Sequence, residues 1–201
     1  MVQIRKRRLE IALQKLRPLA SMNATLEQYA TPAGIAADLL WEAFTAGDIT
    51  GRSVIDLGCG NGILAIGAKL MGAGSVTGID IDHEAVKIAQ ENADSLSLDI
   101  SFVAGHVNSV QGTYDTVLQN PPFGAQTQHA DRAFVKKALE LSSRVYSLHN
   151  DGTEEFLEKL VRALGGRSTV VTKYKFEIPY AFEFHRKATE TISVVLLRFE
   201  R

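Results

Sequence analysis

The feature that most constrains this chain is a regular alternation of apolar strands and helical segments that begins at Ser53. Such an alternation is typical of a parallel sheet, because each parallel strand needs a crossover to its neighbour. We therefore expect an α/β domain with helices on both faces of the sheet. The strands are predicted over residues 53–57, 75–80, 100–104, 113–119 and 143–148, and the helices over residues 62–71, 82–93, 131–141 and 153–164.

The last two apolar runs, residues 168–174 and 191–199, break this alternation because no helical pattern separates them. They can pair antiparallel through the connection of residues 175–190. The result is a seven-stranded, mostly parallel sheet whose last strand is antiparallel. The 201 residues can close one substantial core and contain no internal repeat. Residues 1–201 are therefore predicted to form a single domain.

Two helices are predicted ahead of the first strand. Leu9, Leu13 and Leu16 form an apolar stripe on a short helix with a basic face, which Pro18 ends. Thr31 is predicted to cap a second helix that has Pro32 at its first position. Residues 1–30 are thus an N-terminal helical extension.

Composition excludes several classes of protein. The net charge of −1 and the pI near 6.5 argue against binding nucleic acid by bulk electrostatics, so any such contact must be local. The single cysteine cannot form an internal disulfide, and no Cys/His spacing indicates a zinc site. The charged N-terminus does not fit a signal peptide or membrane helix. We expect a metal-free cytoplasmic protein.

A glycine-rich turn follows the first predicted strand and precedes a helix. Glycines at positions 58, 60 and 62 are two residues apart, whereas a dinucleotide fingerprint separates its second and third glycines by three. This spacing favours a nucleoside with an amino-acid tail over a pyrophosphate. A strand-to-helix turn with no ligand is the alternative for the turn taken alone.

Two further residues are expected to contact that nucleoside. Asp80 ends the second strand, where its carboxylate can accept hydrogen bonds from both ribose hydroxyls, while Asp82 caps the next helix. His106 follows the third strand, and a neutral imidazole there could accept from the adenine amino group.

The strongest single signal is Asn120-Pro121-Pro122-Phe123 directly after the fourth strand. An exocyclic amino nitrogen is a poor nucleophile because its lone pair is delocalised, and acceptors that pull it toward tetrahedral geometry assist transfer. The Asn120 side-chain oxygen and the Pro121 carbonyl can supply two such acceptors, fixed by the successive prolines. Phe123 can stack on an extruded base. An ordinary loop that closes a strand is the alternative.

Together these motifs resemble the small-subunit rRNA adenine-N6 methyltransferases of the methyltransferase-like group. The resemblance includes Gln28-Tyr29 with Thr31, Tyr146-Ser147-Leu148-His149 and Phe184-His185-Arg186-Lys187, and it leaves only about the first twenty residues unmatched. It implies a Rossmann-like class I methyltransferase fold, S-adenosylmethionine as cofactor, RNA as substrate, and a possible small zinc-binding activator subunit.

The resemblance also implies roles for individual residues. Gln28 and Thr31 would close over the methionine end of the cofactor, while Gly58, Asn61 and Ile63 would line it and Asp80 would hold the ribose. Two departures are His106, where the pattern more often has an acidic residue, and Asn61 in place of a small residue. The full set expected to bind the cofactor is Gln28, Thr31, Asp56, Gly58, Gly60, Asn61, Ile63, Asp80, Ile81, His106 and Val107.

Several alternatives remain open from the sequence. The stretch from Phe176 to Lys187 interleaves aromatic and cationic residues, which fits a single-stranded base platform and equally a cover for the sheet edge. His149 fits a core group better than a substrate contact, and Cys59 fits a buried filler. The rival functions are a protein methyltransferase acting on a glutamine amide, which usually has Tyr at the position of Phe123, and a non-catalytic cofactor- or RNA-binding module.

Overall fold

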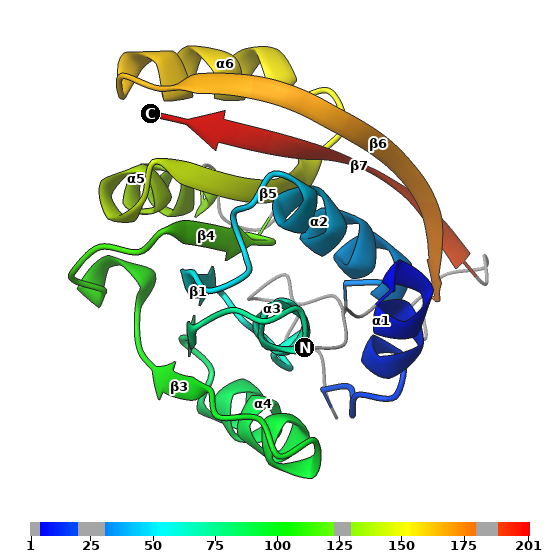
Figure 1. The fold of residues 1–201 in the computed structure, drawn as a ribbon. Helices are drawn as coiled ribbons and strands as arrows, with labels where there is room; N and C mark the ends of the chain where they lie inside the picture. The colour runs from blue at the N-terminus through cyan, green and yellow to red at the C-terminus, as the bar shows by residue number, and fades with distance from the viewer. Residues whose placement is uncertain (1–4, 20–30, 123–129, 180–188) are drawn as a thin grey trace.

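The computed structural model describes residues 5–19, 31–122, 130–179 and 189–201. Gln28, Phe123 and Phe184 to Lys187 lie outside these residues. The described chain forms one seven-stranded sheet with the order β3-β2-β1-β4-β5-β7-β6 (Figure 1). The strands are β1 (Ser53–Leu57), β2 (Ser75–Asp80), β3 (Ser101–Ala104), β4 (Thr116–Gln119), β5 (Arg144–Asn150), β6 (Arg167–Pro179) and β7 (Thr189–Glu200).

The strand directions confirm the predicted topology. Strands β1 to β5 pair parallel with one another, and β7 is antiparallel to both β5 and β6. The β6–β7 ribbon is longer than expected, because its strands pair from Arg167 with Glu200 as far as Pro179 with Thr189. Figure 1 shows β6 curving past α2. Tyr174 of β6 packs against the core cluster that includes Leu39 and Leu40 of α2.

Helices cover both faces of the sheet and enclose two apolar cores. On one face, Leu39 and Leu40 of α2 and Ile66 of α3 pack with Leu118 and Tyr146 of the sheet. On the other face, α5 and α6 pack on Val117, Val145 and the inward side chains of β7. The helices are α1 (Lys6–Leu13), α2 (Ala33–Thr45), α3 (Ile63–Leu70), α4 (His83–Ser95), α5 (Ala130–Leu141) and α6 (Glu154–Ala163), with a short 3-10 helix, η2 (Val107–Ser109).

The helix starts differ from expectation at one informative position. Asp82 caps α4 as predicted, because its side chain accepts from the Glu84 N–H at 2.9 Å. Thr31 does not cap α2: the cap position is Pro32, and no side chain there accepts from the helix. The Thr31 hydroxyl instead accepts a hydrogen bond from Asn120. The prediction of a Thr31 cap was therefore wrong, since a tertiary partner replaces the local one.

The N-terminal helix is shorter than its apolar stripe suggested. Helix α1 ends at Leu13, ahead of Pro18, while Leu9 and Leu13 are buried against α2 and α3 as the stripe predicted. Its basic face is partly paired, since Lys6 Nζ lies 2.6 Å from Asp38 Oδ1. Across the part of the chain that the structure describes, no helix is both long and apolar enough to span a membrane.

Candidate active site

Three predicted parts of the site, namely the glycine turn, Asp80 and Asn120, lie at the carboxyl edge of three adjacent strands. Leu57 at the end of β1 pairs with Ile79 of β2 on one side and with Gln119 of β4 on the other. The residues that follow these strands therefore lie side by side. The sheet thus brings together the glycine turn, Asp80 and Asn120, which are far apart in the sequence.

The backbone of the glycine turn adopts conformations that favour glycine over residues with a Cβ atom. Gly58, Gly60 and Gly62 all have positive φ, of 73°, 53° and 84°. The turn is tied to β2, because the N–H groups of Gly58 and Cys59 donate to the Ile79 carbonyl at 2.8 and 2.9 Å. At Gly60 a Cβ would meet no atom within 4 Å, so the turn is open on that side.

Asp80 joins the turn to β2 through its carboxylate. Oδ2 accepts from the Gly60 N–H at 2.8 Å, and Oδ1 accepts from the Asp82 N–H at 3.0 Å. Burial raises the pKa of Asp80, while these two hydrogen bonds oppose the rise. Each carboxylate oxygen has a second lone pair, so Asp80 keeps the capacity to accept from two hydroxyls. Its role in shaping the turn was not predicted from the sequence.

Asp56 lies behind the turn and not at its open side. Its side chain is buried, and Oδ2 accepts from the Ala65 N–H in the first turn of α3 at 3.0 Å. Burial raises the pKa of Asp56 to about 7 against the opposing effect of that hydrogen bond. Asp56 therefore joins β1 to α3. Cys59 is buried, as expected of a filler, and burial raises the pKa of its thiol.

A buried asparagine that was not predicted as a site residue joins the N-terminal segment to the turn by hydrogen bonds. Asn92 Oδ1 accepts from the Arg17 N–H at 2.8 Å, and its Nδ2 donates to the carbonyls of Arg17 and Asn61 at 3.1 and 3.0 Å. Asn61 also donates from Nδ2 to the Arg17 carbonyl at 3.2 Å. Asn92 could have been found from the sequence as an amide on the apolar face of the amphipathic helix α4.

The remaining predicted cofactor residues divide by exposure. The side chains of Ile63 and Val107 are buried and pack in the two cores. Ile81, next to Asp80, is 54% exposed, which leaves an apolar side chain at the edge where a flat ring could lie.

His106 makes a different hydrogen bond from the one predicted. Its Nδ1 accepts from the Asn108 N–H at 3.1 Å and so caps η2. A neutral ring with Nδ1 as acceptor carries its proton on Nε2. The expectation that His106 accepts from an adenine amino group therefore does not fit: the ring offers a donor, which suits an adenine ring nitrogen.

Asn120 and the two prolines lie directly at the end of β4. Asn120 is half-buried, Pro121 is buried and Pro122 is half-buried. Asn120 Nδ2 donates to Thr31 Oγ1 at 2.8 Å across 89 positions of sequence. Thr31 is thus placed against the Asn-Pro-Pro motif.

A row of buried polar side chains runs beneath this motif on β4 and β5. Gln119 Nε2 donates to Ser147 Oγ at 3.0 Å, and Ser147 Oγ lies 2.6 Å from His149 Nε2. Burial lowers the pKa of His149 to about 3, so the ring is neutral near pH 7. His149 is 1% exposed, which confirms the expectation of a core group, although it lies within β5 and not at its end.

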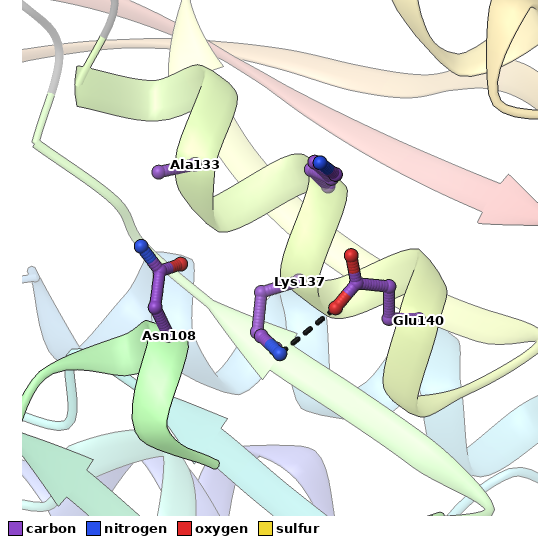
Figure 2. Close-up of a pocket in the computed structure, with 5 residues that line it drawn as sticks. Asn108, Ala133, Lys137 and Glu140 are labelled. Atoms are coloured by element: carbon purple, nitrogen blue, oxygen red, sulfur yellow. Dashed lines mark ion pairs between the residues drawn. The ribbon is translucent and has the colours of Figure 1, made fainter. Parts of the chain in front are cut away.

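A polar groove of about 250 Å³ lies between η2 and α5, lined by Asn108, Ala133, Lys136, Lys137 and Glu140 (Figure 2). Lys137 Nζ is paired with Glu140 Oε2 at 2.8 Å. The groove contains none of the predicted cofactor or catalytic residues, so we assign it no part in the site. Within the described ranges, no group of His, Cys, Asp and Glu side chains could hold a metal ion.

Comparison with known proteins agrees with this geometry. Protein MJ0284 of Methanocaldococcus jannaschii is 41% identical over 98% of this chain and 95% of its own length. The rRNA N(6)-adenosine-methyltransferase METTL5 of Danio rerio is 35% identical over 95% of this chain and 96% of its own. The crystal structure of PH1948 from Pyrococcus horikoshii, a candidate RNA methyltransferase, superposes with a TM-score of 0.91 at 42% identity, covering 100% and 99% of the two chains. Residues 32–178 match the methyltransferase small domain, and the chain belongs to that family.

Proposed function

We propose that this chain transfers a methyl group from S-adenosylmethionine to the N6 amino group of an adenosine in small-subunit ribosomal RNA. The observation that carries the proposal is the position of Asn120. It follows β4, beside the glycine turn on β1, and two prolines hold the backbone after it. The full-length similarity to an rRNA N(6)-adenosine-methyltransferase supports the choice of an adenine amino group.

The residues at the sheet edge fit the proposed cofactor. The positive-φ turn is open at Gly60, which allows close backbone approach, as an amino-acid tail would need. Asp80 keeps lone pairs for two ribose hydroxyls, and Ile81 presents exposed apolar surface for the adenine ring. Nε2–H of His106 would donate to a ring nitrogen. When bound, the cofactor would supply a methyl group attached to a sulfonium sulfur, and that sulfur would depart as a neutral thioether.

The protein's contribution to the chemistry is alignment. Asn120 Oδ1 and the Pro121 carbonyl would accept from the two N–H groups of the target amine and so localise its lone pair toward the methyl group. No strong base is needed, because the amine becomes acidic as the new N–C bond forms. Acceptors held before substrate arrives cost no reorganisation in the transition state.

Further parts of the proposal rest on the family resemblance. Gln28 would contact the methionine end of the cofactor, Phe123 would stack on the target base, and Phe184 to Lys187 would contact RNA. Residues 1–30 would cover the cofactor as an extension of a single domain. We also propose a small zinc-binding activator subunit and a cytoplasmic location.

The experiment that tests the function identifies the methylated atom. The protein is incubated with labelled S-adenosylmethionine and small-subunit rRNA from cells that lack its gene, and digested nucleosides are analysed by mass spectrometry. We expect the label in N6-methyladenosine. Label confined to glutamine side chains of protein, with unmodified RNA under the same conditions, would overturn the proposal.

A further inference from the structure

We propose that Asn92 is a positioning residue for the cofactor site: it holds the glycine turn in shape and couples it to the N-terminal segment of residues 14–19. The inference rests on the proposed function and assigns a role to a buried residue of α4. Its basis is three hydrogen bonds made by one side chain. Oδ1 accepts from the Arg17 N–H at 2.8 Å, and Nδ2 donates to the carbonyls of Arg17 and Asn61 at 3.1 and 3.0 Å.

The partners of Asn92 fix the orientation of its amide. A backbone N–H can only donate and a carbonyl can only accept, so a flipped amide would lose all three bonds. Asn92 is 4% exposed and shares the buried face of α4 with Ile88 and Ala89. Packing alone would favour an apolar residue at this position. The amide is therefore explained by the backbone groups that it bonds.

The glycine turn is held from two sides. On the β2 side, Asp80 Oδ2 accepts from the Gly60 N–H at 2.8 Å. On the α4 side, Asn92 donates to the carbonyl of Asn61, the next residue along the turn. Glycine has more backbone freedom than any other residue, and fixing that freedom when a ligand binds costs conformational entropy. By holding the turn before the cofactor arrives, Asn92 lowers the entropy cost of binding.

The same amide holds the N-terminal segment. Both backbone groups of Arg17 are bonded to Asn92, and Asn61 Nδ2 donates to the Arg17 carbonyl at 3.2 Å. Because these bonds use the backbone of Arg17, they do not depend on its side chain. The segment and the turn therefore share one set of hydrogen bonds. By thermodynamic reciprocity, a ligand that orders the turn should also stabilise the docked segment.

A neighbouring contact between the same two elements supplies a matched control. Arg17 Nη1 is paired with Glu91 Oε2 at 2.6 Å, next to Asn92 on α4. These two side chains are 61% and 43% exposed, and exposed ion pairs contribute little to stability. Glu91→Ala therefore removes a contact between α4 and residue 17 without touching the turn. Asn92→Ala removes all three amide bonds, and Asn92→Leu, which refills the space with an apolar side chain, replaces it if Asn92→Ala does not fold.

The first test is calorimetric titration with S-adenosylmethionine, run beside single-turnover methyl transfer to small-subunit rRNA. We expect Asn92→Ala to weaken cofactor binding about fivefold to tenfold, the effect of losing one buried hydrogen bond to the turn. At saturating cofactor its transfer rate should stay within about twofold of wild type, because Asn92 does not contact the reacting atoms. Glu91→Ala should match wild type in both measurements.

The second test is amide hydrogen exchange of residues 14–19 with and without cofactor. We expect S-adenosylmethionine to slow this exchange in wild type and in Glu91→Ala, and not in Asn92→Ala. Two results overturn the inference: lower stability of Asn92→Ala in urea with normal cofactor affinity, or equal slowing of exchange by the cofactor in all three proteins. Failure of the proposed function looks different, because the wild type itself would then leave RNA unmodified.

Discussion

His149 provides a sharp test of how β5 is packed beneath the site. The ring is buried on the face of the sheet covered by α5 and α6, and its Nε2 meets Ser147 Oγ at 2.6 Å. Burial lowers its pKa from 6.5 to about 3. We therefore expect His149→Gln, which keeps a polar partner for Ser147 and cannot titrate, to change how stability depends on pH.

The sign follows from proton binding. Below pH 6.5 the unfolded chain binds a proton at His149 while the folded chain does not, until the pH approaches 3. The contribution of His149 to stability is thus complete above pH 6.5 and is lost as the pH falls. Between about pH 7.5 and pH 5, the loss comes to about 2 kcal/mol in the free energy of unfolding.

The assay is urea unfolding of both proteins at these two pH values. Asp56 has the opposite influence, since its raised folded pKa of about 7 adds stability as the pH falls, but it is present in both proteins and cancels in the comparison. Between pH 7.5 and pH 5, the free energy of unfolding of wild type should fall by about 2 kcal/mol more than that of His149→Gln. Equal losses would refute a buried, neutral His149 and would reopen a role in contacting substrate.

Two further predictions concern the cofactor edge and the sheet. Asp80→Ala should weaken S-adenosylmethionine binding by at least about tenfold in calorimetric titration, because it removes the proposed ribose acceptor and the partner of the Gly60 N–H; a change within about twofold would remove Asp80 from the site. Gly78→Ala should destabilise the fold by about 1–3 kcal/mol in urea unfolding, since its Cβ would lie 2.5 Å from the Phe102 ring. Gly34→Ala, whose Cβ would lie 3.4 Å from Glu10 Oε1, is the control and should be neutral or stabilising; equal losses at the two glycines would contradict the packing argument.

The fold was predictable from the sequence because its signals are local. Alternating apolar segments and the missing helix before residues 191–199 were sufficient to predict seven strands with the last one reversed. The strand ends were less accurate: β4 begins at Thr116 and not at residue 113, because Asp115 is held by hydrogen bonds to Ser53. Pairing between distant segments decides such boundaries.

The location of the site was predictable from the sequence, but the hydrogen-bond partners of its residues were not. Motifs after strands had to meet at one edge of the sheet, so Asp80 and Asn120 could be placed together. The bonds of Thr31 to Asn120 and of Asn92 to Arg17 join residues 89 and 75 positions apart, and no local pattern encodes them. Local rules assigned Thr31 to a helix cap, which the tertiary contact replaced.

The central claim is that Asn120 accepts from the target amino group in the transition state. The most direct measurement is single-turnover methyl transfer to small-subunit rRNA by Asn120→Ala, run beside cofactor titration of the same variant. Loss of one preorganised acceptor should cost on the order of 3 kcal/mol, or about a hundredfold in rate, with cofactor affinity unchanged. Near-normal transfer by Asn120→Ala would contradict the account.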